Sequence, residues 1–501
     1  MKKWKIYLPL LSLCGALAVT GGIWGVMRGS TWNGQMELTH LEGDESALAD
    51  FQIDGFITDV RNGWYFSIVD GTLQKKSFSM TNEDAFFDYG QVRGIWKDGT
   101  MEFRNGGVNF QPWADSEVET AEVTDFSQLW KDGKFPSELY DGDGEAHVTT
   151  HTFEKSQAVL CVDMKAEQTK GKGLYRWSYE IPTNMQYIPK EPFVNIVIND
   201  ENNETSEIND QGNEIEVVSV WSQSQEMLYA TLKTNEKCRG SIGLYCLGPK
   251  EEESFGDEGS TGRPTRTEPV ATLAEIPVSE NRWVLGLEDV GEGLLLFIGE
   301  ADSVTAELYS YEGELLDSKN IQTGEPVHEI EVQQTDWESG RGIYVKGSQN
   351  IEENAYFVHC FAGYWVEDGI LSLVYLPEDG QGDVTRTAVG KDRVLTIRYK
   401  EGEWGGKAEA VHGNIWNGLE LCVYDTAEDL AGRWIYRGEL ETDIDEDMLE
   451  FLATSKTEES NQSIQRQNLR RLGGWNRYLK VMDISGKGGE RVWEEGSWYH
   501  Y

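Results

Sequence analysis

The sequence has few basic residues for its size. It holds 44 Lys and Arg against 87 Asp and Glu among 501 residues, which gives a formal net charge of −43. Because proteins bind phosphate backbones mainly through Lys and Arg, this balance argues against a nucleic-acid partner. It also argues against a chain that lies flat on an anionic lipid surface. A solvated acidic surface accounts for the charge, and attraction of Ca²⁺ or of a basic partner is the functional alternative.

Recognisable catalytic motifs are missing as well. The sequence contains no G-x-S-x-G nucleophile elbow, no H-E-x-x-H zinc motif, no G-x-x-x-x-G-K-[ST] phosphate loop and no G-x-G-x-x-G dinucleotide fingerprint. Glycoside hydrolysis needs two carboxylates about 5 to 9.5 Å apart. With 87 acidic residues, the sequence does not single out such a pair. The catalytic residues of any enzymatic activity are therefore unknown from the sequence.

Cysteine is too sparse and too irregular for a disulfide framework. Cys161, Cys360 and Cys422 each lie in an apolar, strand-like run, and we expect them as buried side chains. Cys238 and Cys246 would be about 26 Å apart on one extended strand. A disulfide between these two would therefore require a turn that folds the chain back.

The longest hydrophobic segment is the apolar run Ile6 to Val26, and it contains no charge. As a helix, residues 6–26 would span roughly 31 Å, which matches the hydrocarbon core of a bilayer. Three lysines precede the run and Arg28 follows it, so the positive-inside rule places the N-terminus in the cytoplasm. Residues 1–28 are therefore predicted to be a cytoplasmic tip and a transmembrane anchor in the cell membrane.

Two other readings of this segment remain open. A signal peptide could be cleaved at Ala16 to Ala18, although that motif lies inside the apolar run. A lipid could be attached to Cys14, although Leu13 stands where lipoprotein signals have Gly or Ala. Every reading places the remaining chain outside the cytoplasm. We expect residues 29–50 to form an acidic juxtamembrane spacer with one helical turn, and residues 51–501 to form an extracytoplasmic β domain.

Pairs of strand-like runs recur through most of the chain. In Gly413 to Asp443, an apolar run, a polar turn and a second run with Trp434 and Tyr436 follow one another. The 54 Gly and 18 Trp against 12 Pro also favour strands joined by many turns. The first runs of the pairs start about 60 to 70 residues apart, a regular spacing typical of radial repeats. These first runs are Ala158 to Met164, Met227 to Leu232, Leu294 to Ile298, Tyr356 to Phe361, Leu419 to Tyr424 and Tyr478 to Ile484.

Some of these pairs resemble known propeller repeats. Trp221 to Ala230, WSQSQEMLYA, resembles the strand-turn-strand "WSPDGKKIAF" of TolB-type propellers but lacks its Pro, Asp and Gly. Ala306 to Leu316 resembles the outer hairpin of many propeller blades. The resemblance covers scattered stretches of about 150–440 and implies architecture only. We expect an all-β fold, a β-propeller of about seven blades behind a single N-terminal transmembrane helix; the alternative is a tandem array of β-sandwich domains.

The densest cluster of metal-ligating residue types is Asp141, Asp143 and Glu145, followed by His147 and His151. On a helix, the two histidines could chelate one metal ion, but their segment is β-branched and is predicted as a strand. On a strand their rings would be about 13 Å apart, too far for one ion. The three acidic residues remain the metal-ligand candidates.

No cofactor is predicted. Ca²⁺ is the one ion that the acidic loops Asp200 to Asp210 and Glu378 to Asp383 would suit, because it takes carboxylate and carbonyl oxygens. Solvated acidic loops are the competing interpretation of the same residues.

Function is predicted mainly by elimination. The apolar anchor, the repeats and the missing motifs favour a membrane-anchored, extracytoplasmic binding or scaffold protein whose partner is an envelope protein or a glycan. The alternative is an extracytoplasmic carbohydrate-active enzyme with paired carboxylates and a Trp-lined groove. A third hypothesis is a structural module of a larger envelope complex. Because several tryptophans lie in or beside the repeated hairpins, we expect most of them to pack in the core.

Overall fold

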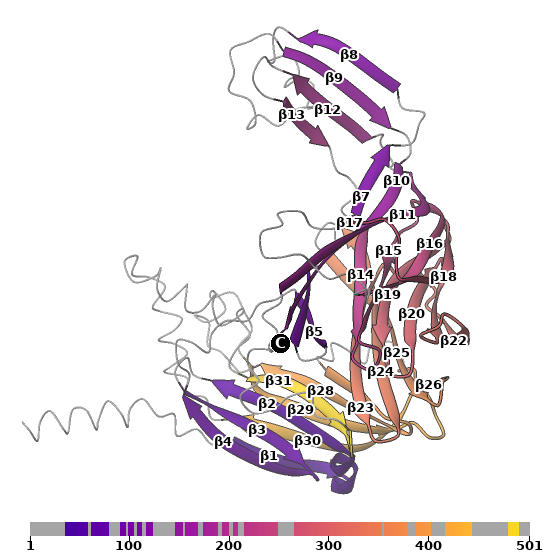
Figure 1. Ribbon diagram of the computed structural model, residues 1–501. Coiled ribbons are helices and arrows are strands. Elements are labelled where there is room, and N and C mark those ends of the chain that lie inside the picture. Colours follow the sequence, from indigo (N-terminus) through magenta and orange to yellow (C-terminus); the bar gives the residue numbers. More distant parts are fainter. Residues whose placement is uncertain are drawn as a thin grey trace, which may run out of the picture.

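The structure is a computed structural model, and almost all of its regular structure is β-strand (Figure 1). Within the described residues the one helical element is a single short 3-10 helix. The all-β class expected from the sequence is confirmed. The described residues are 36–58, 62–79, 91–96, 99–104, 108–112, 117–123, 146–153, 156–168, 174–188, 193–199, 204–208, 215–248, 265–352, 355–377, 386–401, 416–442 and 479–489.

One four-stranded sheet joins the two ends of the described chain. Its order is β31-β2-β3-β4, and β31 pairs antiparallel with β2. The yellow β31 and the indigo β2 therefore lie side by side in Figure 1. The strands are β31 (Leu479–Gly486), β2 (Phe51–Thr58), β3 (Asn62–Val69) and β4 (Thr72–Ser79). This sheet can form only when both ends of the chain are in place.

Two further sheets each consist of four consecutive antiparallel strands whose order follows the chain. The first contains β19 (Arg282–Asp289), β20 (Leu294–Glu300), β21 (Ser303–Tyr309) and β22 (Leu315–Gln322). The second contains β23 (Glu329–Trp337), β24 (Gly340–Glu352), β25 (Ala355–Glu367) and β26 (Ile370–Tyr375). The first strands of the two sheets, β19 and β23, contact each other.

Residues 36–50, which we expected to belong to a polar spacer, form part of the folded sheets. β1 (Met36–Gly43) pairs with β30 and completes the five-stranded sheet β1-β30-β29-β28-β27. The 3-10 helix η1 (Glu45–Asp50) follows, and its Ala47 and Leu48 are buried in the core. The expected helical turn is confirmed, whereas β1 depends on a partner almost 400 residues away. The other strands of this sheet are β27 (Arg386–Val389), β28 (Arg393–Glu401), β29 (Trp416–Asp425) and β30 (Arg433–Thr442).

The middle of the chain forms a ten-stranded sheet with the path β14-β15-β16-β11-β10-β6-β5, to which β7, β17 and β18 are added. A separate sheet, β13-β12-β9-β8, projects from one end of the molecule (Figure 1). The strands of the large sheet are β5 (Gln91–Trp96), β6 (Gly99–Arg104), β7 (Val108–Pro112), β10 (Ser156–Gln168), β11 (Leu174–Tyr187), β14 (Glu216–Ser222), β15 (Met227–Lys233), β16 (Cys238–Leu247), β17 (Thr265–Arg266) and β18 (Ala271–Val278). Those of the projecting sheet are β8 (Glu117–Val123), β9 (Ala146–Phe153), β12 (Phe193–Asn199) and β13 (Glu204–Ile208).

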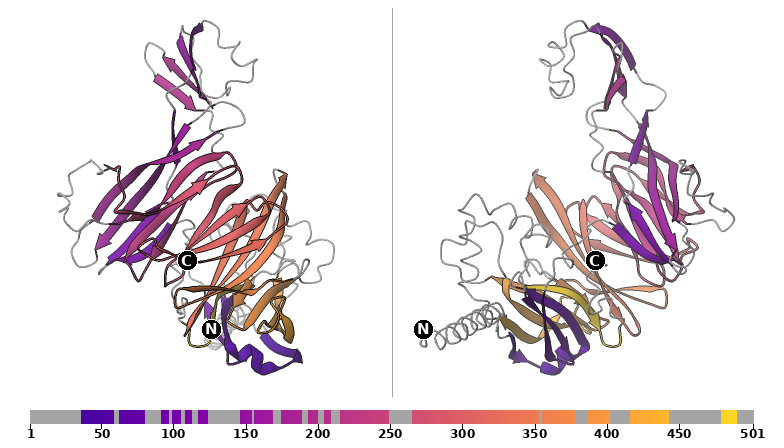
Figure 2. Two further views of the ribbon diagram at one scale, coloured as in Figure 1. Left: turned by 90° about the vertical axis from the view of Figure 1, so that its right-hand side faces the viewer. Right: turned by 60° about the vertical axis from the view of Figure 1, so that its left-hand side comes forward.

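The sheets follow one another along an arc in the views of Figures 1 and 2. Such curled, successive sheets are compatible with a β-propeller and with β-sandwich domains alike. The expected strand pairs are confirmed where they are described, since each first run named from the sequence lies within or overlaps a strand. The run Thr305 to Leu316 differs, because it ends β21, turns and begins β22.

Two hairpins close with consecutive residues at positive φ. Asp70 and Gly71 join β3 to β4 at +49° and +69°, and Asp368 and Gly369 join β25 to β26 at +54° and +72°. Type I′ turns require positive φ at both central positions, which Asp-Gly satisfies well. Asp-Gly is a hairpin signal that can be read from the sequence, and at Asp70-Gly71 the structure has the turn that this signal predicts.

Asn62-Gly63 is another dipeptide that predicts a hairpin turn, but these residues do not form the turn. Both residues begin strand β3, where Gly63 pairs with Thr58 of β2. The two strands do form a hairpin, so the sequence signal identified the pairing but not the residues that reverse the chain.

The indole of Trp337, at the end of β23, lies where three sheets meet. Its N–H donates a hydrogen bond of 2.8 Å to the carbonyl of Val389 at the end of β27. The ring packs edge-on against Trp365 of its own sheet and Phe51 of β2, with centroid distances of 6.0 and 5.3 Å. Gly486 of β31 lies so close that a Cβ there would collide with the indole. One side chain thus holds together the sheets of β23, β27 and β31.

The hairpin of β29 and β30 places its aromatic residues on opposite sides. Tyr436 is fully buried, whereas Trp434 is 38% exposed, so the expectation that Trp434 packs in the core is wrong. The register shifts between Val423 and Tyr424, which gives β30 one extra residue at this point. Such a bulge turns residues two apart onto different faces. Cys422 on β29 is half-buried rather than fully buried.

Cys238 and Cys246 both lie on β16, both are buried and neither forms a disulfide. The turn that a disulfide between them would require is therefore not formed. Burial raises the pKa of the Cys238 thiol to about 12 and that of Cys246 to about 11, so both remain protonated thiols at neutral pH.

The predicted anchor, residues 6–26, lies outside the described part of the chain. Within the part that is described, no helix has the length and apolar character needed to cross a bilayer. The anchor and its alternatives therefore stay predictions.

Replacing Trp337 by Ala is expected to lower the free energy of unfolding by about 3 kcal/mol, because it removes a large packed side chain and its hydrogen bond at a three-sheet junction. Trp434→Ala is the matched control and should change stability by less than about 0.5 kcal/mol, since that ring is exposed. Chemical denaturation of both variants measures the difference. Equal losses would contradict the assigned role of Trp337.

Candidate functional site

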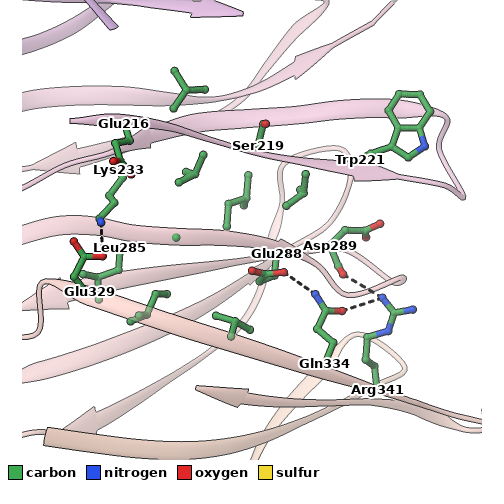
Figure 3. Close-up of a pocket in the computed structure, with 17 residues that line it drawn as sticks. Glu216, Ser219, Trp221, Lys233, Leu285, Glu288, Asp289, Glu329, Gln334 and Arg341 are labelled. Atoms are coloured by element: carbon green, nitrogen blue, oxygen red, sulfur yellow. Dashed lines mark hydrogen bonds and ion pairs between the residues drawn. The ribbon is translucent and has the colours of Figure 1, made fainter. Parts of the chain in front are cut away.

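An open groove crosses the strands β14, β19 and β23 (Figure 3). Each of these strands lies at an edge of its own sheet, and β19 contacts both of the others. The cavity has a volume of about 720 Å³. From Glu329 to Gln334 on β23, the groove is about 17 Å long at the usual rise of a strand.

Branched apolar side chains line the middle of the groove: Val218 and Val220 from β14, Leu287 from β19, and Ile330 and Val332 from β23. These residue types suit strands packed closely side by side. The absence of a side chain at Gly286 permits that approach, because a Cβ there would lie 2.9 Å from Cδ1 of Ile330.

At one end of the groove, Lys233 and Glu329 form an ion pair of 2.6 Å. The lysine side chain is largely buried, whereas the glutamate is half exposed, so solvent screens the pair. Glu216 lies exposed at the same end (Figure 3). The pair joins β15 to β23, two strands that belong to different sheets.

At the other end, a chain of hydrogen bonds begins at Glu288. The side-chain amide of Gln334 donates to a carboxylate oxygen of Glu288 at 2.7 Å (Figure 3). The amide oxygen of Gln334 accepts a hydrogen bond from Arg341 at 3.3 Å. Arg341 also donates to the backbone carbonyl of Asp289 and forms a 2.6 Å ion pair with Asp336. The neutral side-chain amide of Gln334 therefore separates the guanidinium of Arg341 from the carboxylate of Glu288.

The carboxyl group of Glu288 titrates unusually high. Burial at the wall of the groove raises its pKa to about 7, and the neighbouring negative charge of Asp289 raises it further, while the hydrogen bond from Gln334 lowers it. Near neutral pH this group is therefore an even mixture of carboxyl and carboxylate.

The side chain of Asp289, the next residue, has different hydrogen-bond partners. Its side chain accepts hydrogen bonds from the Tyr311 hydroxyl at 2.5 Å and from the backbone N–H of Gly291 at 3.0 Å. Burial, together with this hydrogen bond, raises the pKa of Tyr311 to about 12, so the phenol stays protonated and remains a donor. Asp289 is thus a fixed structural acceptor rather than a free acid.

Comparisons with known proteins assign no relationship. No protein-family model matches the chain, and no curated protein matches it significantly. The groove is therefore interpreted from its own residues.

The metal candidates named from the sequence are not tested by this site. Asp141, Asp143 and Glu145 lie outside the described residues. His147 and His151 both lie on β9, so the strand predicted for them is confirmed. Among the residues that are described, no group of three or more His, Cys, Asp or Glu is placed to hold a metal ion. Part of the acidic segment Asp200 to Asp210 is strand β13, and Glu378 to Asp383 is not described.

Sequence reasoning missed the residues that form the groove. Glu288 and Asp289 directly follow the apolar run Trp283 to Leu287, which is the only local signal that they possess. Gln334 and Arg341 come from the next sheet, and nothing in the sequence connects them with Glu288. Of the residues that line the groove, Trp221 is the one tryptophan, so this groove is not the Trp-lined groove considered above.

The arrangement suits binding better than catalysis. Two of the groove's carboxylates already have partners, because Glu329 pairs with Lys233 and Asp289 accepts from Tyr311. Glycoside hydrolysis needs a second free carboxylate opposite the acid. An apolar middle with polar ends instead resembles the usual lining of a ligand site.

Replacing Glu288 by Gln is expected to stabilise the protein at pH 8 and to have little effect at pH 4.5. The native pKa lies above the ordinary value of 4.5, so the native state binds the proton more tightly than the unfolded state does. The cost of the charged carboxylate therefore grows as pH rises from about 4.5 and levels off above about 7. The gain at pH 8 should be about 1–2 kcal/mol.

Denaturant unfolding from pH 4.5 to 8 measures this difference. Glu314→Gln is the matched control, because Glu314 is exposed and lies in the turn between β21 and β22. A pH-independent difference between wild type and Glu288→Gln would contradict the raised pKa.

Proposed function

We propose that the chain is a membrane-anchored, extracytoplasmic binding or scaffold protein built on a β-propeller. The observation that carries the binding role is the groove across β14, β19 and β23, with its apolar middle and its charged ends. The anchor rests on the apolar run Ile6 to Val26 and the lysines that precede it.

The propeller is supported by the topology of the sheets. The sheets of β19 to β22 and of β23 to β26 are antiparallel meanders in chain order, and their first strands lie next to each other. The sheet of β31, β2, β3 and β4 combines strands from both ends of the chain, as a closed ring of blades requires. A propeller of about seven blades would bring the edges of its first strands around a common axis.

A carbohydrate-active enzyme is the second candidate, and Glu288 favours it. A carboxyl group with a pKa of about 7 is suited to act as a general acid, and Trp221 lies at the same end of the groove (Figure 3). The partnered state of Asp289 and Glu329 weighs against this candidate.

The test compares the full chain in detergent micelles with a variant whose groove is filled, Ser219→Trp. Ser219 lines the groove from β14 and is half-buried, so an indole at this position would fill part of the groove. We expect an array of extended peptides to bind the wild type and to lose binding at least tenfold in the variant. Circular dichroism of the variant checks that it remains folded.

A glycan array and a hydrolysis assay on the same two proteins decide between the candidates. Glycan binding followed by hydrolysis, both lost in Ser219→Trp, would favour the enzyme over the binding protein. If the filled groove changes the binding of no peptide and no glycan, the proposed role of the groove is wrong.

A further inference from the structure

No cation among the described residues forms an ion pair with the carboxylate of Glu288. Glu329 has Lys233 as its partner, and the guanidinium of Arg341 is paired with Asp336. The carboxylate of Glu288 accepts one hydrogen bond from the neutral amide of Gln334, and its nearest charged neighbour on β19 is Asp289, which is also negative. A cation brought to this point would relieve the cost of a buried charge.

The position of Glu288 also suits a ligand that has the shape of an extended chain. The carboxylate lies at one end of a groove about 17 Å long with an apolar middle, and this length corresponds to about five residues of an extended chain. The walls are strands at sheet edges, and edge strands present backbone donors and acceptors that an added strand can use. Apolar side chains of such a segment would face Val218, Val220, Leu287, Ile330 and Val332.

We propose that the groove binds an extended peptide segment that carries a lysine or arginine, and that Glu288 receives the side-chain cation. This inference rests on the proposed binding function of the same groove and adds the chemical class of its ligand. The formal net charge of −43 favours the same class, because a strongly acidic protein attracts a basic segment over long range.

The same geometry makes binding dependent on pH. The groups that face Glu288 are Gln334 from β23, Asp289 from its own strand and, behind the amide, Arg341 from β24. The remaining charged groups of the groove are Lys233, Glu329 and Glu216, and they lie at the opposite end (Figure 3). Since the pKa of the free Glu288 is about 7, the carboxylate is formed at pH 8 and is mostly protonated at pH 6. A lysine peptide should therefore bind about tenfold more weakly at pH 6 than at pH 8.

The experiment uses acetylated, amidated pentapeptides of alternating Val and Thr with a single Lys at each position in turn. Each is compared with the same peptide carrying norleucine, which has a similar length but no charge. Fluorescence anisotropy gives the affinity of the full chain in detergent micelles at pH 8 and pH 6. At the best position, lysine should bind at least tenfold more tightly than norleucine at pH 8.

Two variants show whether a preference for lysine comes from the charge of Glu288 or from the net charge of the protein. Glu288→Gln and Glu314→Gln each remove one negative charge, but Glu314 is exposed and lies outside the groove. The preference for lysine and its pH dependence should disappear in Glu288→Gln and persist in Glu314→Gln. Equal losses in the two variants would show that net charge alone causes the preference, and would overturn the inference.

The remaining outcomes distinguish this inference from the proposed function. If lysine and norleucine peptides bind equally well and Ser219→Trp abolishes both, the groove binds peptides but Glu288 receives no cation. If no peptide binds, both the ligand class and the peptide-binding role are wrong. A lysine preference that Ser219→Trp abolishes and Glu288→Gln removes supports both.

Discussion

The close packing of neighbouring sheets around Trp337 is the constraint on which the rest of the described structure depends. One indole touches the sheets of β23, β27 and β31, and its N–H satisfies the carbonyl of Val389, which would otherwise end a strand without a partner. Gly486 makes room for the ring, and Gly342 lets β24 approach Val389 in the same region. Because a packed interior tolerates little extra volume, these glycines fix the spacing of the sheets.

The groove also lies between neighbouring sheets. When edge strands from successive sheets lie next to one another, their side chains fill the gap only partly, and the open part is lined by β14, β19 and β23. Glu288 is then partly withdrawn from bulk water without receiving a cation in exchange, which is why its pKa rises to about 7. Asp289, one residue further on, is stabilised by Tyr311 and Gly291 and serves the structure. Adjacent acids thus acquire different chemistry from their surroundings.

The strand pairs could be predicted because their signals are local. Asp70-Gly71 specifies a turn through backbone conformation alone, and Trp221 to Ala230 contains both strands and the turn of one hairpin. Long-range features had no such signal. β1 looked like part of a spacer because its partner, β30, lies near the other end of the chain. The exposure of Trp434 follows from a bulge in β30, which alternation in the sequence does not reveal.

The all-β class, several strand pairs, the strongly acidic composition and the apolar run that predicts an anchor follow from composition and short-range periodicity. The sequence does not distinguish one of the 87 acidic residues from another, whereas the packed sheets give Glu288 unusual chemistry. Among the described acids, Glu288 is set apart by burial and by Gln334, a residue from another sheet. Both are properties of the packed sheets, and neither is encoded in the residues that flank Glu288 along the chain.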